Sequence, residues 1–222
     1  MQPDLARRVA AEALGTGFLV AAVVDSGVMA SRLAGGNAAL ALLGNTIPTG
    51  AILVVLILCF APISGAHFNP AVSWVAAMRK SLSRSEFAAY IVAQVIGGCA
   101  GTIAAHLMFD LAPVQLGETA RTGGAQWFAE LVATFGLVMT ILALQTRTDA
   151  IPYAVGLYIT AAYWFTASTS FANPAVTIAR SLTATFAGIA PSDAPMFILA
   201  QFTGAGLSLA AMTWLLARRP AA

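Results

Sequence analysis

Charged residues are scarce in this chain. Of its 222 residues only 9% are Asp, Glu, Lys or Arg, whereas a typical soluble domain carries roughly 25%. Hydrophobic residues make up 59% of the chain, and the mean hydropathy is +0.82. A soluble fold with so few charges could not cover its own surface, so we expect the lipid bilayer to cover it. The composition therefore predicts an integral membrane protein.

Cysteines and basic runs are equally sparse. The two cysteines, Cys59 and Cys99, lie in apolar segments without CxxC spacing, which predicts two packed thiols; a disulfide or a metal site is the alternative. The net charge is only +2 and no basic run occurs, so we expect no nucleic-acid partner. Because no nucleophile–base pair, metal cluster or phosphate loop appears, we expect neither an enzyme nor a cofactor.

Long apolar runs fill most of the remaining chain. A membrane-spanning helix needs about 20 apolar residues, and six runs come close to that length: 8–30, 48–66, 86–109, 126–145, 152–169 and 195–217. Two shorter pieces, 70–78 and 174–182, each follow an Asn-Pro pair directly. Nine helical residues extend only ~13 Å, less than half of a ~30 Å hydrocarbon core. The sequence thus predicts six transmembrane helices plus two re-entrant half-helices that cross the membrane together.

The positive charges are unevenly divided between the two predicted sides of the membrane. One side carries Arg7, Arg8, Arg79, Lys80, Arg84, Arg147, Arg218 and Arg219. The other side carries Arg32, Arg121 and Arg180. Because Lys and Arg accumulate in cytoplasmic segments, we expect a protein of the cell (inner) membrane with both termini in the cytoplasm.

Three stretches of the first half recur in the second half in the same order. AEALGT at 11–16 is repeated as AELVAT at 129–134, FNPAVS at 68–73 as ANPAVT at 172–177, and IVAQ at 91–94 as ILAQ at 198–201. The chain is therefore predicted to be one channel domain, 1–222, built from repeats of about 1–110 and 126–219. Each repeat holds three spans, an odd number, so the second is inverted and the functional site is expected near the midplane.

The Asn-Pro pairs are predicted to start helices rather than to break them. Asn is a favourable N-cap, and Pro suits the first helical position because its missing N–H would have no partner there. Two such starts in inverted halves would meet near the bilayer centre, with both positive dipole ends aimed at one spot. The residues that form this centre are Asn69, Pro70, Ala71, Asn173, Pro174 and Ala175. We therefore expect a pore that repels cations and protons but passes small uncharged solutes and water.

These motifs resemble the aquaporin (major intrinsic protein) family. The resemblance rests on SGAHFNPAV at 64–72, on the second Asn-Pro-Ala and on the Ala-Glu-x-x-x-Thr opening of each half, and it covers nearly the whole chain. Two Asn-Pro-Ala motifs, 104 residues apart at 69 and 173, are far more specific than one. The resemblance implies an all-α fold of six tilted helices and two half-helices, one pore in each protomer, and a homotetramer.

In this family four side chains form the narrowest point of the pore, the selectivity filter. Counting from the motifs places them at Thr49, Tyr163, Ser170 and Val176. On the fifth span the count leaves Ala161 as the alternative to Tyr163. The family typically carries an Arg directly after the second Asn-Pro-Ala, where this chain has Val176. The next arginine, Arg180, lies one helical turn further on, and we expect it to be a structural residue away from the constriction.

A filter without that Arg is predicted to be wide, with hydroxyl groups on one side and an apolar wall on the other. Glycerol, urea and neutral metalloid hydroxides such as arsenous acid fit it, and methylated arsenicals fit the apolar wall better. The stretch NPAVTIARSL at 173–182 is similar to a bacterial branch associated with arsenic resistance in which Val replaces the filter Arg. A water-selective pore and an ion-coupled secondary transporter are the alternatives.

Two acidic residues and one histidine complete the candidate site. Glu12 and Glu130 lie within predicted spans at matching places in the two halves. Intramembrane carboxylates are often functional, but this symmetry favours a structural role, accepting backbone N–H groups of the half-helix loops, over a proton relay. His67 precedes the first half-helix, and we expect it to line the cytoplasmic vestibule.

Overall fold

A computed structural model describes residues 3–217, and within this range the chain is helical without a strand. The helices are α1 (Leu5–Leu33), α2 (Ala38–Ser64), α3 (Pro70–Met78), α4 (Arg84–Met108), α5 (Gly124–Ala143), η1 (Thr148–Ala150), α6 (Ile151–Phe165), α7 (Pro174–Arg180) and α8 (Ala194–Leu215). The prediction of an all-α membrane fold with two short re-entrant helices is confirmed.

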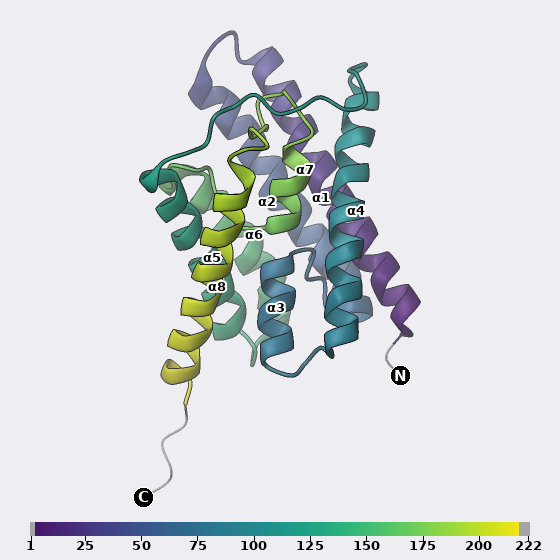
Figure 1. Cartoon of the computed structure of the whole chain (residues 1–222), viewed down its shortest axis with the longest axis vertical. Coiled ribbons are helices and arrows are strands. Elements are labelled where there is room, and N and C mark those ends of the chain that lie inside the picture. Colours follow the sequence, from purple (N-terminus) through teal and green to yellow (C-terminus); the bar gives the residue numbers. More distant parts are fainter. Residues whose placement is uncertain (1–2, 218–222) are drawn as a thin grey trace, which may run out of the picture.

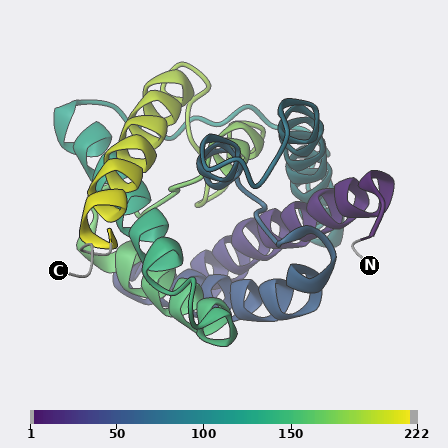
Figure 2. The same ribbon diagram turned by 90° about the horizontal axis from the view of Figure 1, so that it is seen from below.

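The first half of the chain forms α1 to α4, and the second forms α5 to α8 (Figure 1). Helix α1 packs against α2 and α4, and in the same way α5 packs against α6 and α8. Helices α2 and α6 join the halves. The half-helices α3 and α7 both lie between α4 and α8, inside the ring of longer helices that Figure 2 shows from below.

Small residues allow the long helices of each half to cross closely. A Cβ atom added to Gly97 in α4 would collide with the carbonyl oxygen of Ala13 in α1. In the second half, a Cβ atom added to Gly204 in α8 would collide with the carbonyl oxygen of Leu131 in α5. Close backbone approach is how helices pack when lipid supplies no hydrophobic driving force between them.

Capping side chains explain where several helices begin. Asp4 accepts the backbone N–H of Arg7 at the start of α1, and Asn37 accepts that of Leu40 at the start of α2. Ser83 and Glu86 form a capping box at the start of α4. These residues satisfy N–H groups that have no partner in the first turn of a helix.

Two predicted spans differ from the observed helices by more than the others do. Helix α2 begins at Ala38, ten residues before the predicted start at 48, because Pro48 lies inside the helix and Asn45 is buried, donating to the carbonyl of Val23. Helix α6 ends at Phe165, before the predicted 169. Its 15 residues extend about 22 Å, whereas α1, α2, α4, α5 and α8 are long and apolar enough to cross a membrane.

The outer surface of the bundle is apolar, as expected for a protein surrounded by lipid. Large side chains that are mostly exposed occur on every long helix, among them Phe18, Ile96, Phe128, Leu157 and Leu199. Helix α1 begins and α8 ends at the same end of the bundle (Figure 1). Two of the arginines used to orient the chain, Arg218 and Arg219, lie outside the described residues.

Candidate pore

The loops that lead into the two half-helices have matching backbones. Ala66 and Ser170 both have φ of 52°, and Phe68 and Ala172 have φ of 49° and 48°. Non-glycine residues seldom adopt this left-handed conformation, which persists only where the surroundings hold it. The same unusual geometry therefore recurs at positions 104 residues apart, the offset that separates the two Asn-Pro-Ala motifs.

A buried carboxylate holds each loop. Glu12 accepts the backbone N–H groups of His67 at 2.9 Å and Phe68 at 2.6 Å. Glu130 accepts those of Phe171 and Ala172, both at 2.8 Å. Both glutamates are fully buried. Buried acceptors for loop N–H groups stabilise the strained backbone.

Each carboxylate also binds a glutamine that reaches the adjacent half-helix. Gln94 donates to Glu12 at 2.8 Å and to the hydroxyl of Ser73 in α3 at 2.9 Å. The second half repeats this connection, with Gln201 donating to Glu130 and to Thr177 in α7; the distances are 2.6 Å and 2.9 Å. The connection from carboxylate to glutamine to half-helix hydroxyl is therefore the same in both halves.

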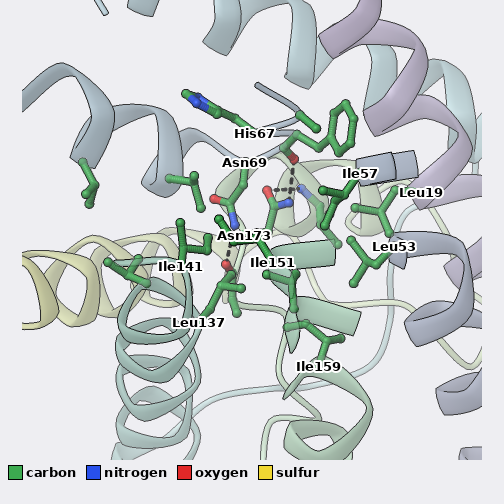
Figure 3. A pocket seen from close by; sticks show the side chains of 18 of the residues that line it. Leu19, Leu53, Ile57, His67, Asn69, Leu137, Ile141, Ile151, Ile159 and Asn173 are labelled. Carbon is green, nitrogen blue, oxygen red and sulfur yellow. Dashed lines mark hydrogen bonds between the residues drawn. The ribbon is translucent and has the colours of Figure 1, made fainter. Parts of the chain in front are cut away.

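The two Asn-Pro-Ala motifs meet and hold each other. The amide nitrogen of Asn69 donates to the carbonyl of Ala172 at 2.7 Å, and that of Asn173 donates to the carbonyl of Phe68 at 2.8 Å. Each amide oxygen caps its own half-helix, accepting from Ala71 or Ala175. An amide NH₂ group carries two donors, so one N–H of each asparagine remains for the cavity beside it (Figure 3).

A cavity of about 410 Å³ passes these asparagines and is lined from both ends of the bundle. One end, here called the inner end, is lined by Arg79, Ser81 and Gln145; the other, the outer end, by Tyr163, Ser170 and Arg180. Between them, aliphatic side chains face the two asparagines (Figure 3): Leu19, Leu53, Ile57, Leu137, Ile141, Ile151 and Ile159. The middle of the cavity is therefore apolar except for a narrow line of amide and loop groups.

The structure brings together the four predicted filter residues. Thr49 from α2, Tyr163 from α6, and Ser170 and Val176 from the second loop and α7 all line the cavity. Ala161, the alternative on the fifth span, does not line it and is exposed. The Tyr163 hydroxyl lies 3.4 Å from that of Thr49, whose own proton is donated to the Asn45 carbonyl at 2.8 Å.

Arg180 lies on the wall of the same cavity as Val176. The side chain is almost fully buried, its Nε donates to the carbonyl of Ala187, and its guanidinium carbon lies 3.4 Å from the centre of the Phe171 ring. These contacts hold the side chain against the loop and ring beside it. The position on the cavity wall differs from the expectation that Arg180 would lie away from the constriction.

Arg121 lies beside the pore without lining the cavity, and the sequence did not predict its contacts. It lies in the connection between α4 and α5, and its side chain donates to the carbonyls of Gly188 at 2.9 Å and Ser168 at 3.2 Å. Its guanidinium carbon lies 5.0 Å from the centre of the Phe171 ring. Burial lowers the pKa of Arg121. Arg121 thus ties together the segments before and after α7.

His67 lines the cavity in the first half. Its Nδ1 lies 3.0 Å from the Ser73 hydroxyl, and its ring packs edge-on against Tyr90. It is the counterpart of Phe171, which packs edge-on against Phe197.

Two inverted halves whose re-entrant helices meet across a cavity inside a membrane-spanning bundle form a channel architecture. The major intrinsic protein family matches residues 1–151. Aquaglyceroporin AqpS of Rhizobium meliloti (strain 1021) is 62% identical over 96% of this chain and 91% of its own length. Aquaporin NIP2-3 of Zea mays is 31% identical over 81% of this chain and 61% of its own length.

The aquaglyceroporin from Plasmodium falciparum, in its X-ray structure, has a similar fold, with a TM-score of 0.72 at 20% identity, covering 93% of this chain and 95% of that one. This chain belongs to the major intrinsic protein family. It is accordingly a multi-pass membrane channel and not an enzyme.

Proposed function

We propose that this protein is a passive channel with a wide filter for small uncharged polar solutes. We expect glycerol-type solutes, neutral metalloids such as arsenite or methylated arsenicals, and water to pass. The observation that carries the proposal is Val176 on the wall of the outer end, beside the hydroxyls of Thr49, Tyr163 and Ser170. The likeness to a relative named as an aquaglyceroporin supports the glycerol part.

The chemistry of the wall matches solutes with one polar and one apolar side. Polyols and metalloid hydroxides donate and accept hydrogen bonds through hydroxyl groups, which the asparagine amides and filter hydroxyls can meet. Methyl or methylene groups can lie against Val176 and the aliphatic side chains. A pore lined mainly by apolar groups with a few placed donors selects by shape and by hydrogen bonding.

The setting of the channel is part of the proposal. We expect a homotetramer in the cell (inner) membrane with the start of α1 and the end of α8 on the cytoplasmic side. The excess of positive residues at that end and the family resemblance support this arrangement.

The test compares wild-type protein with Val176→Arg in proteoliposomes by stopped-flow light scattering. The permeants are water, glycerol and a neutral arsenical, and Val176→Leu is the control that keeps an apolar side chain. Arg is longer and charged, so we expect it to reduce glycerol flux at least about tenfold and water flux much less. Val176→Leu keeps most of the glycerol flux.

Three results would contradict the proposal. Passage of water alone by the wild type supports a water-selective pore. Saturating flux that follows a proton or sodium gradient supports a secondary transporter. Equal loss of glycerol flux in Val176→Arg and Val176→Leu would show that the side chain at position 176 does not determine selectivity in the proposed way.

A further inference from the structure

The outer end of the cavity carries two polar side chains with hydrogen-bonding atoms that find no partner in the described part of the protein. The Ser170 hydroxyl is buried and makes no hydrogen bond among residues 3–217. Arg180 donates through Nε to Ala187, while its two terminal nitrogens meet no acceptor in the same range. Both side chains line the cavity. Buried polar groups are normally satisfied by protein, water or a ligand, so these two are available to a permeating molecule.

Helix geometry explains why Arg180 faces the cavity. Positions 176 and 180 are one turn apart in α7, and residues four apart lie on the same helix face. The equivalent pair in α3 is Val72 and Ala76, each 104 residues earlier, and both also line the cavity. The second turn of each half-helix therefore presents a side chain to the cavity, an Ala in one half and an Arg in the other.

Arg180 forms no salt bridge among the described residues. The cavity-lining residues include Arg79 and Arg180, but the described part of the chain adds no Asp or Glu to them. Stacking on Phe171 and the bond to Ala187 hold the guanidinium in place. An unpaired charge in a narrow passage of low dielectric constant strongly repels ions of the same sign.

We propose that Arg180 is the specificity-determining cation of the outer constriction. Its guanidinium excludes cations, and its terminal N–H groups, together with the Ser170 hydroxyl, bind the oxygen atoms of a neutral solute. Val176 leaves space in the first turn of α7, and the arginine of the second turn supplies the charge and the donors, so this end is both wide and positive. The inference rests on the proposed channel function and adds the residue that recognises the solute.

The test compares Arg180→Gln with Arg121→Gln in proteoliposomes. Both variants remove a guanidinium that packs on Phe171, but Arg121 does not line the cavity. Entry of methylammonium at neutral pH measures cation exclusion, and the ratio of glycerol to water flux measures solute recognition. We expect Arg180→Gln to raise methylammonium entry about tenfold or more and to change the ratio. Arg121→Gln leaves both readouts near the wild-type values.

Wild-type values for Arg180→Gln, or the same change in both variants, would overturn the inference. Failure of the wild type to pass any neutral solute would instead overturn the proposed function. If Arg180→Gln does not fold, Ser170→Ala decides, because that hydroxyl has no protein partner whose loss would disturb folding. We expect it to lower the glycerol-to-water ratio severalfold, and an unchanged ratio would overturn the inference.

Discussion

Each half has a loop that leads into a half-helix, and the two loops have matching backbones. Two of the positions at which the side chains of these segments differ line the cavity in both halves. The first position holds His67 in one half and Phe171 in the other. His67 is bonded to Ser73, whereas Phe171 carries the guanidinium groups of Arg121 and Arg180 on its ring. The loop of the first half therefore carries an imidazole, and the loop of the second half carries a phenyl ring with two guanidinium groups packed on it.

The second position holds Ala76 in α3 and Arg180 in α7. Both line the cavity, so at this turn the wall of the inner end carries a methyl group and the wall of the outer end carries a guanidinium group. The groups that hold the backbone, the glutamates, glutamines and asparagines, are the same in both halves. The comparison shows that residues shared by both halves hold the backbone. Residues that differ between the halves give the two ends of the cavity different polarity and charge.

The largest expected effect comes from removing one of the shared carboxylates. Glu12→Leu leaves two backbone N–H groups and the side-chain donors of Ser64 and Gln94 without their acceptor. We expect a loss of about 3–5 kcal/mol of stability, seen as a much lower unfolding temperature in detergent.

Glu130→Leu tests whether the halves depend equally on their carboxylates. Glu130 accepts from three groups rather than four, so its loss is expected to be slightly less harmful. Wild-type unfolding temperatures for both variants would show that these carboxylates do not hold the loops.

An intermediate effect is expected where the long helices cross. Gly97→Val and Gly204→Val each place a side chain against the backbone of the neighbouring helix. Overpacking of this kind costs about 1–3 kcal/mol, and we expect similar shifts of the unfolding temperature in the two halves. Gly124→Ala is the control, since a Cβ atom there meets nothing within 4 Å. A lower unfolding temperature for only one of the two valine variants would show that the helix crossings of the two halves are not equivalent.

The smallest effect is expected from making the first half resemble the second. His67→Phe removes the bond to Ser73, which is worth about 1 kcal/mol, and places a phenyl ring against Tyr90. Combining it with Ser73→Ala in a double-mutant cycle isolates the coupling of the pair. We expect a small loss of stability and an unchanged glycerol-to-water ratio, because the inner end gains no arginine. A large change of that ratio would show that His67 selects the solute.

Much of the scaffold could be predicted from the sequence because its parts are local and duplicated. Asn-Pro-Ala indicates a helix start by itself, and the repeat predicts the same role for Glu12 and Glu130. The start of α2 could not be predicted, because burial of Asn45 against the Val23 carbonyl depends on a neighbouring helix. Pro48 also suggested the start of a helix, although in the structure it lies within α2.

The position of Arg180 was harder to predict than that of Val176. Its helical direction follows from spacing alone, but whether a long side chain packs inward or lies along a cavity depends on the ring of Phe171 and the loop at Ala187. The role of Arg121 depends on tertiary contacts across more than 40 residues. The equivalence of Ala76 and Arg180 was the available signal, since the offset of 104 residues pairs them.

The exchanged bonds of Asn69 and Asn173 have a consequence for ancestry. Each half completes its central loop only with a carbonyl from the other half, in the reciprocal manner of a two-fold interface, where one residue contacts a second and the second contacts the first. A chain of half this length would find the missing carbonyl in another copy of itself, inserted the opposite way up. The molecule is in this sense a dimer whose subunits have been joined into one chain.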